Sequence, residues 1–180
     1  MSGASIHPPE SVGTLVDLLK LRVAEDPDRR MYTFLEDGER EGAVWTRADL
    51  DRKARAVAAE LQALGLVKGD AALLVYPQGL DFVSALVGCM YAGVLGVPAP
   101  SPDPTRLART APRLAQIARD AGAKVVLVHS GLYELHEYLP SELPDIAWLV
   151  TDGITDDKAA AYVEVTSTAD DVAYLQYTSG

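Results

Sequence analysis

The last six residues of the chain, LQYTSG at 175–180, combine the residue types that can bind a phosphate group. The residues up to Tyr177 are typical of a β-strand, and Thr178, Ser179 and Gly180 follow as a turn. Hydroxyl and backbone N–H groups can surround an anion there, because glycine lacks the Cβ that keeps a phosphate at a distance. Taken alone, such residues are more often an ordinary turn after a strand, so the rest of the chain must decide.

Cysteine and histidine indicate no second chemical site. Cys89 is the only cysteine, so no intrachain disulfide can form, and its small apolar neighbours predict a buried thiol and not a nucleophile. His7, His129 and His136 lack the spacing of metal ligands, and no second soft ligand accompanies them. The sequence therefore assigns no catalytic residue and no metal ligand.

The 180-residue chain has a formal net charge of −10, and most of this charge lies in one stretch. Residues 134–171 contain ten acidic residues and one basic residue, Lys158, whereas the remainder has 16 acids and 15 bases. The ordinary explanation of such a stretch is a solvated surface with loops. Its field repels phosphate backbones and anionic lipid, so we expect neither nucleic acid nor a membrane surface as a general partner.

Two segments bear on where the protein resides. Residues 1–9 lack the basic start and the long apolar region of a secretory signal, which predicts a cytoplasmic protein. Residues 82–102 carry no charge and are long enough to cross a bilayer. Glycine and proline interrupt this run repeatedly and no basic cluster flanks it, so we expect no membrane span.

The first third of the chain predicts two helices separated by a hairpin. In order, the expected elements are a helix (14–24), two strands (32–35 and 43–45) and a second helix (46–64). Asp37-Gly38 supplies the turn of the hairpin. Thr46 with Asp49 fits a capping box, and Gly65 fits a Schellman-like end of the second helix.

From residue 71 onward, short apolar runs alternate with helical patterns. The expected strands are 71–76, 94–97, 124–128 and 147–150, the expected helices are 79–92, 110–121 and 132–138, and residues 172–177 would add a further strand. Strands without polar alternation are typical of a parallel sheet buried on both faces. The predicted fold class is therefore α/β: a largely parallel sheet flanked by helices and preceded by a small β-hairpin.

The predicted helix over 79–92 is apolar on two sides. Its bulky face carries Val83, Leu86, Val87 and Met90, and its small face carries Ala85, Gly88, Cys89 and Ala92. Such a helix should be packed from two directions, which is more cover than a lone small domain provides. The pattern favours a larger parent protein.

Residues 171–180, DVAYLQYTSG, resemble the start of the phosphate-binding loop of the adenylate-forming enzymes, which include acyl-CoA synthetases, peptide-synthetase adenylation domains and luciferases. Within that group, the chain resembles the fatty acyl-AMP ligases most. The upstream stretches that support this resemblance occur in family order and spacing: YTFL (32–35) through WTRADL (45–50), YPQGLDF (76–82), and GCMYAGV (88–94) through VPAP (97–100).

The resemblance implies a function for the parent protein. It would use ATP and Mg²⁺ to activate a fatty acid as an acyl-adenylate and pass the acyl group to an acyl carrier protein, often for polyketide or lipopeptide synthesis. Thr178, Ser179 and Gly180 match the start of the family's loop and are the implied ATP contacts. Residues 1–180 would be the N-terminal subdomain of the adenylation domain, inactive alone and without tight binding of ATP or Mg²⁺.

Other functions remain open at this stage. The fragment could come from an acyl-CoA synthetase or a peptide-synthetase adenylation domain, or it could be a non-catalytic binding module. Alternating strands and helices also occur in dinucleotide-binding oxidoreductases. No Gly-x-Gly-x-x-Gly follows residues 71–76, where Pro77-Gln78-Gly79 stands instead, and this weakens the oxidoreductase hypothesis.

Overall fold

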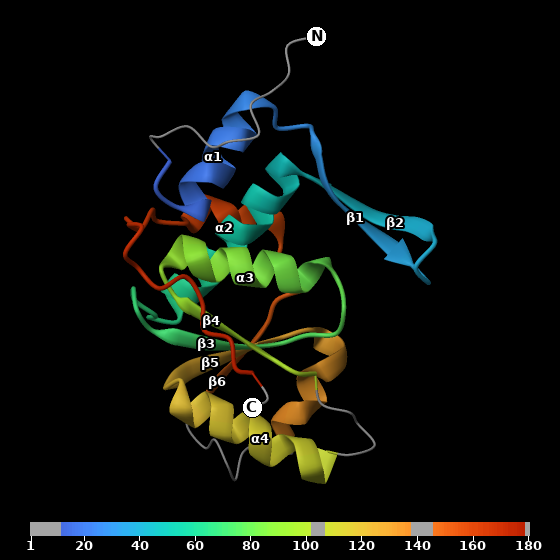
Figure 1. The fold of residues 1–180 in the computed structure, drawn as a ribbon, viewed down its shortest axis with the longest axis vertical. Helices are drawn as coiled ribbons and strands as arrows, with labels where there is room; N and C mark the ends of the chain where they lie inside the picture. Colours follow the sequence, from blue (N-terminus) through green and yellow to red (C-terminus); the bar gives the residue numbers. More distant parts are fainter. Residues whose placement is uncertain (1–11, 102–106, 138–145, 179–180) are drawn as a thin grey trace.

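Figure 1 shows the computed structural model of the chain, which describes residues 12–101, 107–137 and 146–178. In chain order the elements are α1 (Leu15–Glu25), β1 (Arg30–Glu36), β2 (Arg40–Thr46), α2 (Arg47–Ala63), β3 (Ala71–Val75), α3 (Leu80–Ala92), β4 (Leu95–Ala99), α4 (Leu107–Asp120), β5 (Ala123–Val128), the 3₁₀ helix η2 (Ser130–Glu137), β6 (Ala147–Val150) and the 3₁₀ helix η3 (Asp156–Ala161).

Four parallel strands form one sheet in the order β4-β3-β5-β6. Helices α2 and α3 lie on one face of this sheet and α4 lies on the other (Figure 1). The side chains of β3 alternate between the two faces of the sheet: Leu74 packs into the core under α2 and α3, and Leu73 packs into the core under α4. Every residue of β3 is buried, as expected for a parallel sheet that is covered on both faces. The predicted α/β class is confirmed.

The antiparallel hairpin of β1 and β2 precedes the sheet and extends away from it (Figure 1). It leads into α2, whose predicted capping box is present. The Thr46 hydroxyl accepts from the Asp49 N–H at 3.2 Å, and the Asp49 carboxylate accepts from the Thr46 N–H at 2.9 Å. At the other end of α2, Gly65 has a φ of 83° and the Leu66 N–H donates to the Leu61 carbonyl at 3.1 Å, which confirms the Schellman-like end.

Three segments differ from the prediction. Residues 172–177 form no regular strand; a single parallel bridge joins Tyr174 to Gly96 of β4, with one backbone hydrogen bond from the Leu175 N–H to the Gly96 carbonyl. The helix expected over 132–138 is the 3₁₀ helix η2. The 3₁₀ helix η3 was not expected from the sequence.

The uncharged run that begins at Phe82 is divided between α3 and β4, with the turn at Gly93 between them. In the part of the chain that the structure describes, no helix is long and apolar enough to cross a membrane.

Helix α3 packs its small face against α2. Ala85, Gly88, Cys89 and Ala92 are all buried. A Cβ added at Gly88 would lie 2.7 Å from both Cβ and Cγ1 of Val57 and 3.0 Å from the Ala54 carbonyl oxygen. The close approach of α2 and α3 therefore requires glycine at position 88. On the other face of α3, the bulky residues, including Val83, Leu86 and Met90, are only half-buried.

We expect Gly88→Ala to destabilise the fold by about 1–2 kcal/mol, because crowding Val57 outweighs the roughly 1 kcal/mol that alanine gains over glycine in a helix. Thermal unfolding measures the change. Gly79→Ala is the matched control, since a Cβ there meets nothing within 4 Å. The double variant Gly88→Ala/Val57→Ala should recover part of the loss. A single variant at least as stable as the parent would show that α2 and α3 tolerate the added methyl group.

Candidate functional site

The carboxyl ends of the four parallel strands share one edge of the sheet, and residues 172–178 run beside the edge strand β4. The segment runs parallel to β4, since Tyr174 pairs with Gly96 and the Leu175 N–H donates to the Gly96 carbonyl at 3.0 Å. Among the described residues, this is the segment's one pairing with β4. In open α/β sheets, ligands bind outside the carboxyl ends of the strands.

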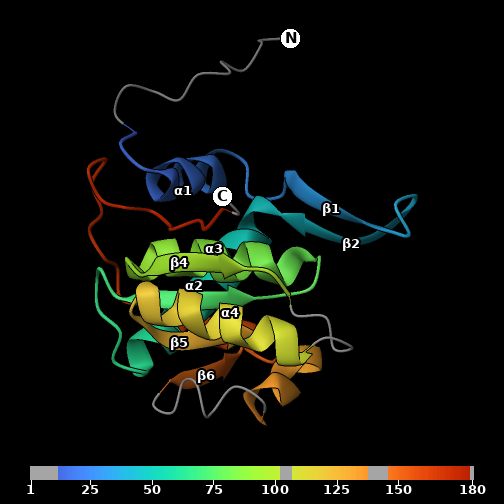
Figure 2. The same cartoon turned by 60° about the horizontal axis from the view of Figure 1, so that its bottom comes forward.

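Two side chains attach this segment to the sheet layer. Leu175 and Tyr177 are half-buried and pack against the core beneath α4. The Tyr177 hydroxyl donates to Asp120 Oδ2, at the end of α4, at 2.5 Å. Figures 1 and 2 show the C-terminal segment passing beside β4.

Of the three residues predicted to contact ATP, the structure describes one. Thr178 is exposed, so its hydroxyl is accessible to a ligand. Ser179 and Gly180 lie outside the described residues. The assignment of these three residues as ATP contacts stays a prediction.

A polar cluster at the same edge was not apparent from the sequence. His129 and Ser130 follow β5, Asp152 follows β6, and Asp81 lies in the first turn of α3. Asp152 accepts from the Ser130 N–H at 2.7 Å and from the Ser130 hydroxyl at 2.5 Å. His129 Nε2 lies 3.6 Å from Asp152 Oδ2 and 3.8 Å from Asp81 Oδ2. Only the parallel topology brings these residues together, because no short motif contains them.

The protonation of this cluster follows from its hydrogen bonds. The Gly131 N–H donates to His129 Nδ1 at 3.0 Å, so this nitrogen carries no proton and Nε2 faces the carboxylates. Burial acts to raise the pKa of the Asp152 carboxyl, but the hydrogen bonds from Ser130 outweigh burial and hold that pKa below its usual value. The cluster ties β5, β6 and α3 together. Among the described residues, no group of three metal-binding side chains could hold an ion.

Two buried groups have structural roles. The Tyr76 hydroxyl and Thr151 Oγ1 are 2.6 Å apart, and burial raises the pKa of Tyr76 far above its usual value. Burial also raises the pKa of Cys89 to about 12, so the thiol stays protonated and unreactive at neutral pH. The prediction of a buried, inert Cys89 is confirmed.

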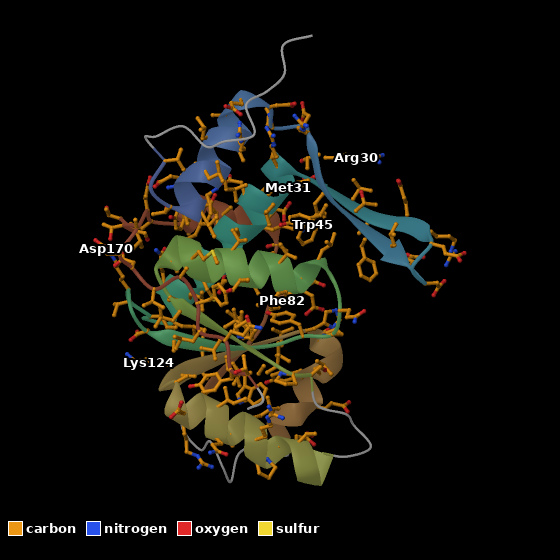
Figure 3. The ribbon with its side chains drawn as sticks, in the orientation of Figure 1. Arg30, Met31, Trp45, Phe82, Lys124 and Asp170 are labelled. Carbon is orange, nitrogen blue, oxygen red and sulfur yellow. The ribbon has the colours of Figure 1, made fainter. Side chains whose placement is uncertain are left out.

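An apolar groove of about 610 Å³ lies between α1, β1, α2 and α3. Its wall on α3 is the bulky face of that helix, including Phe82 and Met90, and Met31 faces it from β1 (Figure 3). Arginines contribute to its lining: Arg22, Arg29, Arg30 and Arg47. Arg47 is fixed by a 2.7 Å hydrogen bond from Nη1 to the Arg22 carbonyl. The sequence predicted that this helix is packed from two directions, whereas in the structure its bulky face borders the groove.

The four-stranded parallel sheet preceded by an antiparallel hairpin matches the N-terminal domain structures of adenylate-forming enzymes. The profile of the AMP-binding enzyme family matches residues 19–180. The chain belongs to this AMP-binding enzyme family.

Individual relatives agree with this assignment. The chain is 46% identical over 171 residues to the medium-chain-fatty-acid–[acyl-carrier-protein] ligase JamA of Moorena producens, covering 93% of this chain and 29% of the relative. It is 31% identical over 180 residues to the 4-hydroxyphenylalkanoate adenylyltransferase of Mycobacterium marinum, covering 94% of this chain and 28% of that protein.

Among solved structures, the fatty acyl-adenylate ligase of Legionella pneumophila in complex with acyl adenylate and pyrophosphate superposes with a TM-score of 0.80. The two sequences are 30% identical over 94% of this chain and 29% of that structure. The chain therefore spans less than a third of the length of these relatives.

Proposed function

We propose that residues 1–180 are the N-terminal subdomain of the adenylation domain of a fatty acyl-AMP ligase. The observation that carries this proposal is the match of the AMP-binding enzyme family over residues 19–180, on a parallel sheet that is preceded by an antiparallel hairpin. The 46% identity to a ligase of medium-chain fatty acids and acyl carrier protein supports the substrate class. The half-buried bulky face of α3 supports a longer parent.

The reaction proposed for the full-length protein has two steps. A carboxylate oxygen of the fatty acid attacks the α-phosphorus of ATP, which forms acyl-AMP and releases pyrophosphate. The thiolate of a phosphopantetheinyl carrier then attacks the acyl carbonyl carbon, which forms the thioester and releases AMP. We propose that the Thr178 and Ser179 hydroxyls and the Gly180 backbone contact the triphosphate, whose charge changes as pyrophosphate leaves.

In this proposal, Mg²⁺ binds to the triphosphate of ATP. Among the described residues, no group of three His, Cys, Asp or Glu side chains could hold a metal ion, so we assign none of them as a magnesium ligand. We also assign no catalytic residue within residues 1–180. The parent would act in fatty acid metabolism, including polyketide synthesis, if its carrier belongs to such a pathway.

The choice between carrier protein and coenzyme A tests the proposed subclass. The full-length protein is given ATP, Mg²⁺ and a medium-chain fatty acid, with phosphopantetheinylated carrier and coenzyme A at equal concentrations. We expect it to form the acyl-carrier thioester in about tenfold or greater excess over acyl-CoA, which corresponds to a difference of roughly 1.4 kcal/mol between the two competing transition states. Mass spectrometry of both thioesters measures the ratio. The carrier lacking its phosphopantetheine is the control. Predominant acyl-CoA would assign the protein to the acyl-CoA synthetases instead.

A further inference from the structure

Residues 163–171 follow η3 along the outside of the molecule, and we call them the strap. None of its side chains is buried: Val165 and Ser167 are half-buried and the others are exposed. Asp170 marks the strap at the outer edge of the molecule (Figure 3). The residue before the strap, Tyr162, packs against the buried Tyr91, with ring centroids 5.6 Å apart. Apolar packing therefore anchors the chain at Tyr162, whereas the strap depends on other contacts.

Side chains of α1 and α2 hold the first part of the strap. Lys20 Nζ of α1 lies 2.5 Å from Glu164 Oε1. The Gln62 side chain of α2 makes two hydrogen bonds with the backbone of Val163: its Nε2 donates to the Val163 carbonyl at 2.7 Å, and its Oε1 accepts from the Val163 N–H at 3.0 Å. The Val163 amide therefore reports whether the strap lies on α2.

Lys68, in the turn after α2, holds the second part of the strap. Its Nζ donates to the Thr166 carbonyl at 3.0 Å and lies 2.6 Å from Asp171 Oδ2. The hydrogen bond from Lys68 lowers the pKa of the Asp171 carboxyl, so this pair is charged at neutral pH. One lysine thus contacts the strap at two positions that are five residues apart.

The strap forms part of the wall of a cavity of about 340 Å³. The lining includes strap residues 167–169, residues 13–16 at the start of α1, and residues 93–95 at the start of β4. Lys68 also lines the cavity, so the side chain that holds the strap twice stands at its wall. Displacing the strap would therefore open the cavity to solvent.

The attachment of the strap should respond to salt. In its two ion pairs, the side chains are between 31% and 72% exposed, so each pair alone adds little to stability. The Debye length falls from about 10 Å at about 0.1 M salt to about 3 Å at about 1 M, which weakens both pairs together. Segments with few buried apolar contacts open at a lower free energy than the core. Salt should therefore release the strap while the sheet stays folded.

We propose that residues 163–171 are a salt-sensitive gate: Lys20 and Lys68 hold the strap closed over the cavity, and the strap opens as one unit when its ion pairs are weakened. Neither the strap nor the cavity takes part in the reaction proposed above, so the gate does not depend on it.

Hydrogen exchange of the Val163 amide in the full-length protein measures the opening. Raising the NaCl concentration from about 0.05 M to about 1 M should speed this exchange about fivefold or more, because the ion pairs are screened. The amide of Val126, a fully buried residue of β5, is the internal control and should not respond. Exchange at Val163 that is the same at both concentrations would overturn the proposal.

Charge variants separate the two lysines from a general effect of salt. Lys68→Met and Lys20→Met should each speed exchange at Val163 several-fold at about 0.05 M NaCl and reduce its response to added salt. The charge-swapped variant Lys20→Glu/Glu164→Lys should recover most of what Lys20→Met loses. Lys158→Met is the matched control, since Lys158 pairs with Glu60 at 2.8 Å and lies outside the strap. Unchanged exchange in Lys68→Met would contradict the role of that lysine as the holder of the gate.

Access to the cavity is measured with the variant Val94→Cys, because Val94 lines the cavity and is only 1% exposed. Alkylation of the new thiol by iodoacetamide, located by mass spectrometry, should become several-fold faster at about 1 M NaCl and in the Lys68→Met background. The native Cys89, which is buried and outside this lining, is the internal reference, and Leu95→Cys provides a second position in the lining. If exchange at Val163 responds but neither introduced thiol does, the strap opens without gating the cavity, and the proposal fails.

Discussion

Replacing Thr178 and Ser179 together with alanine should slow ATP–pyrophosphate exchange by the full-length protein about 100-fold or more. One preorganised hydrogen-bond donor to the charge that develops in a transition state is worth roughly 3 kcal/mol, and two hydroxyls are removed here. Because Thr178 is exposed, the same change should alter the free energy of unfolding by no more than about 0.5 kcal/mol.

Thermal unfolding and exchange must be measured on the same preparations to separate these effects. Thr168→Ala provides a control in which another threonine near the end of the chain is removed: its hydroxyl donates to Asp171 at 3.2 Å, on the same segment but before the bridge to Gly96. Full exchange activity in a folded Thr178→Ala/Ser179→Ala variant would show that the Thr-Ser-Gly motif is an ordinary turn and not a phosphate-binding site.

A polypeptide of residues 1–180 should form no acyl-AMP, whereas the full-length protein should. The adenylate requires groups that hold the adenine, the ribose and the metal, and we assign none of these to residues 1–180. Of the three residues proposed to contact the triphosphate, the structure describes only Thr178, which is exposed. The sequence spans only 29% of JamA, so most of such a site would lie in the remainder of the protein.

Incubation of the 180-residue polypeptide with ATP, Mg²⁺ and radiolabelled fatty acid measures this directly. Circular dichroism must show that the polypeptide is folded, and the full-length protein is the positive control. Acyl-AMP above background from the folded polypeptide would show that these residues contain a complete catalytic site.

Local rules predicted most of the fold. The capping box of Thr46 and Asp49 is read from residues three apart, and the buried strands are read from uninterrupted apolar runs such as residues 124–128. The small face of α3 also follows from helical spacing, and Gly88 confirms it. These features were predictable because each depends on neighbours in the sequence.

The parts of the site that were missed depend on residues far apart in the chain. Tyr177 and Asp120 are 57 positions apart, and Ser130 and Asp152 are 22 apart. No periodicity links such residues, so only the parallel topology places them together. Residues 172–177 have the composition of a strand, but they pair with β4 through a single bridge, which local propensity does not predict.

Direct detection of the acyl-adenylate tests the central claim. The full-length protein is incubated with ATP, Mg²⁺ and a medium-chain or long-chain fatty acid, without carrier protein or coenzyme A, and the products are identified by mass spectrometry. We predict acyl-AMP together with an equal amount of pyrophosphate, and neither product when the fatty acid is omitted. A folded protein that yields no acyl-AMP with any of these fatty acids would contradict the assignment of the chain to a fatty acyl-AMP ligase.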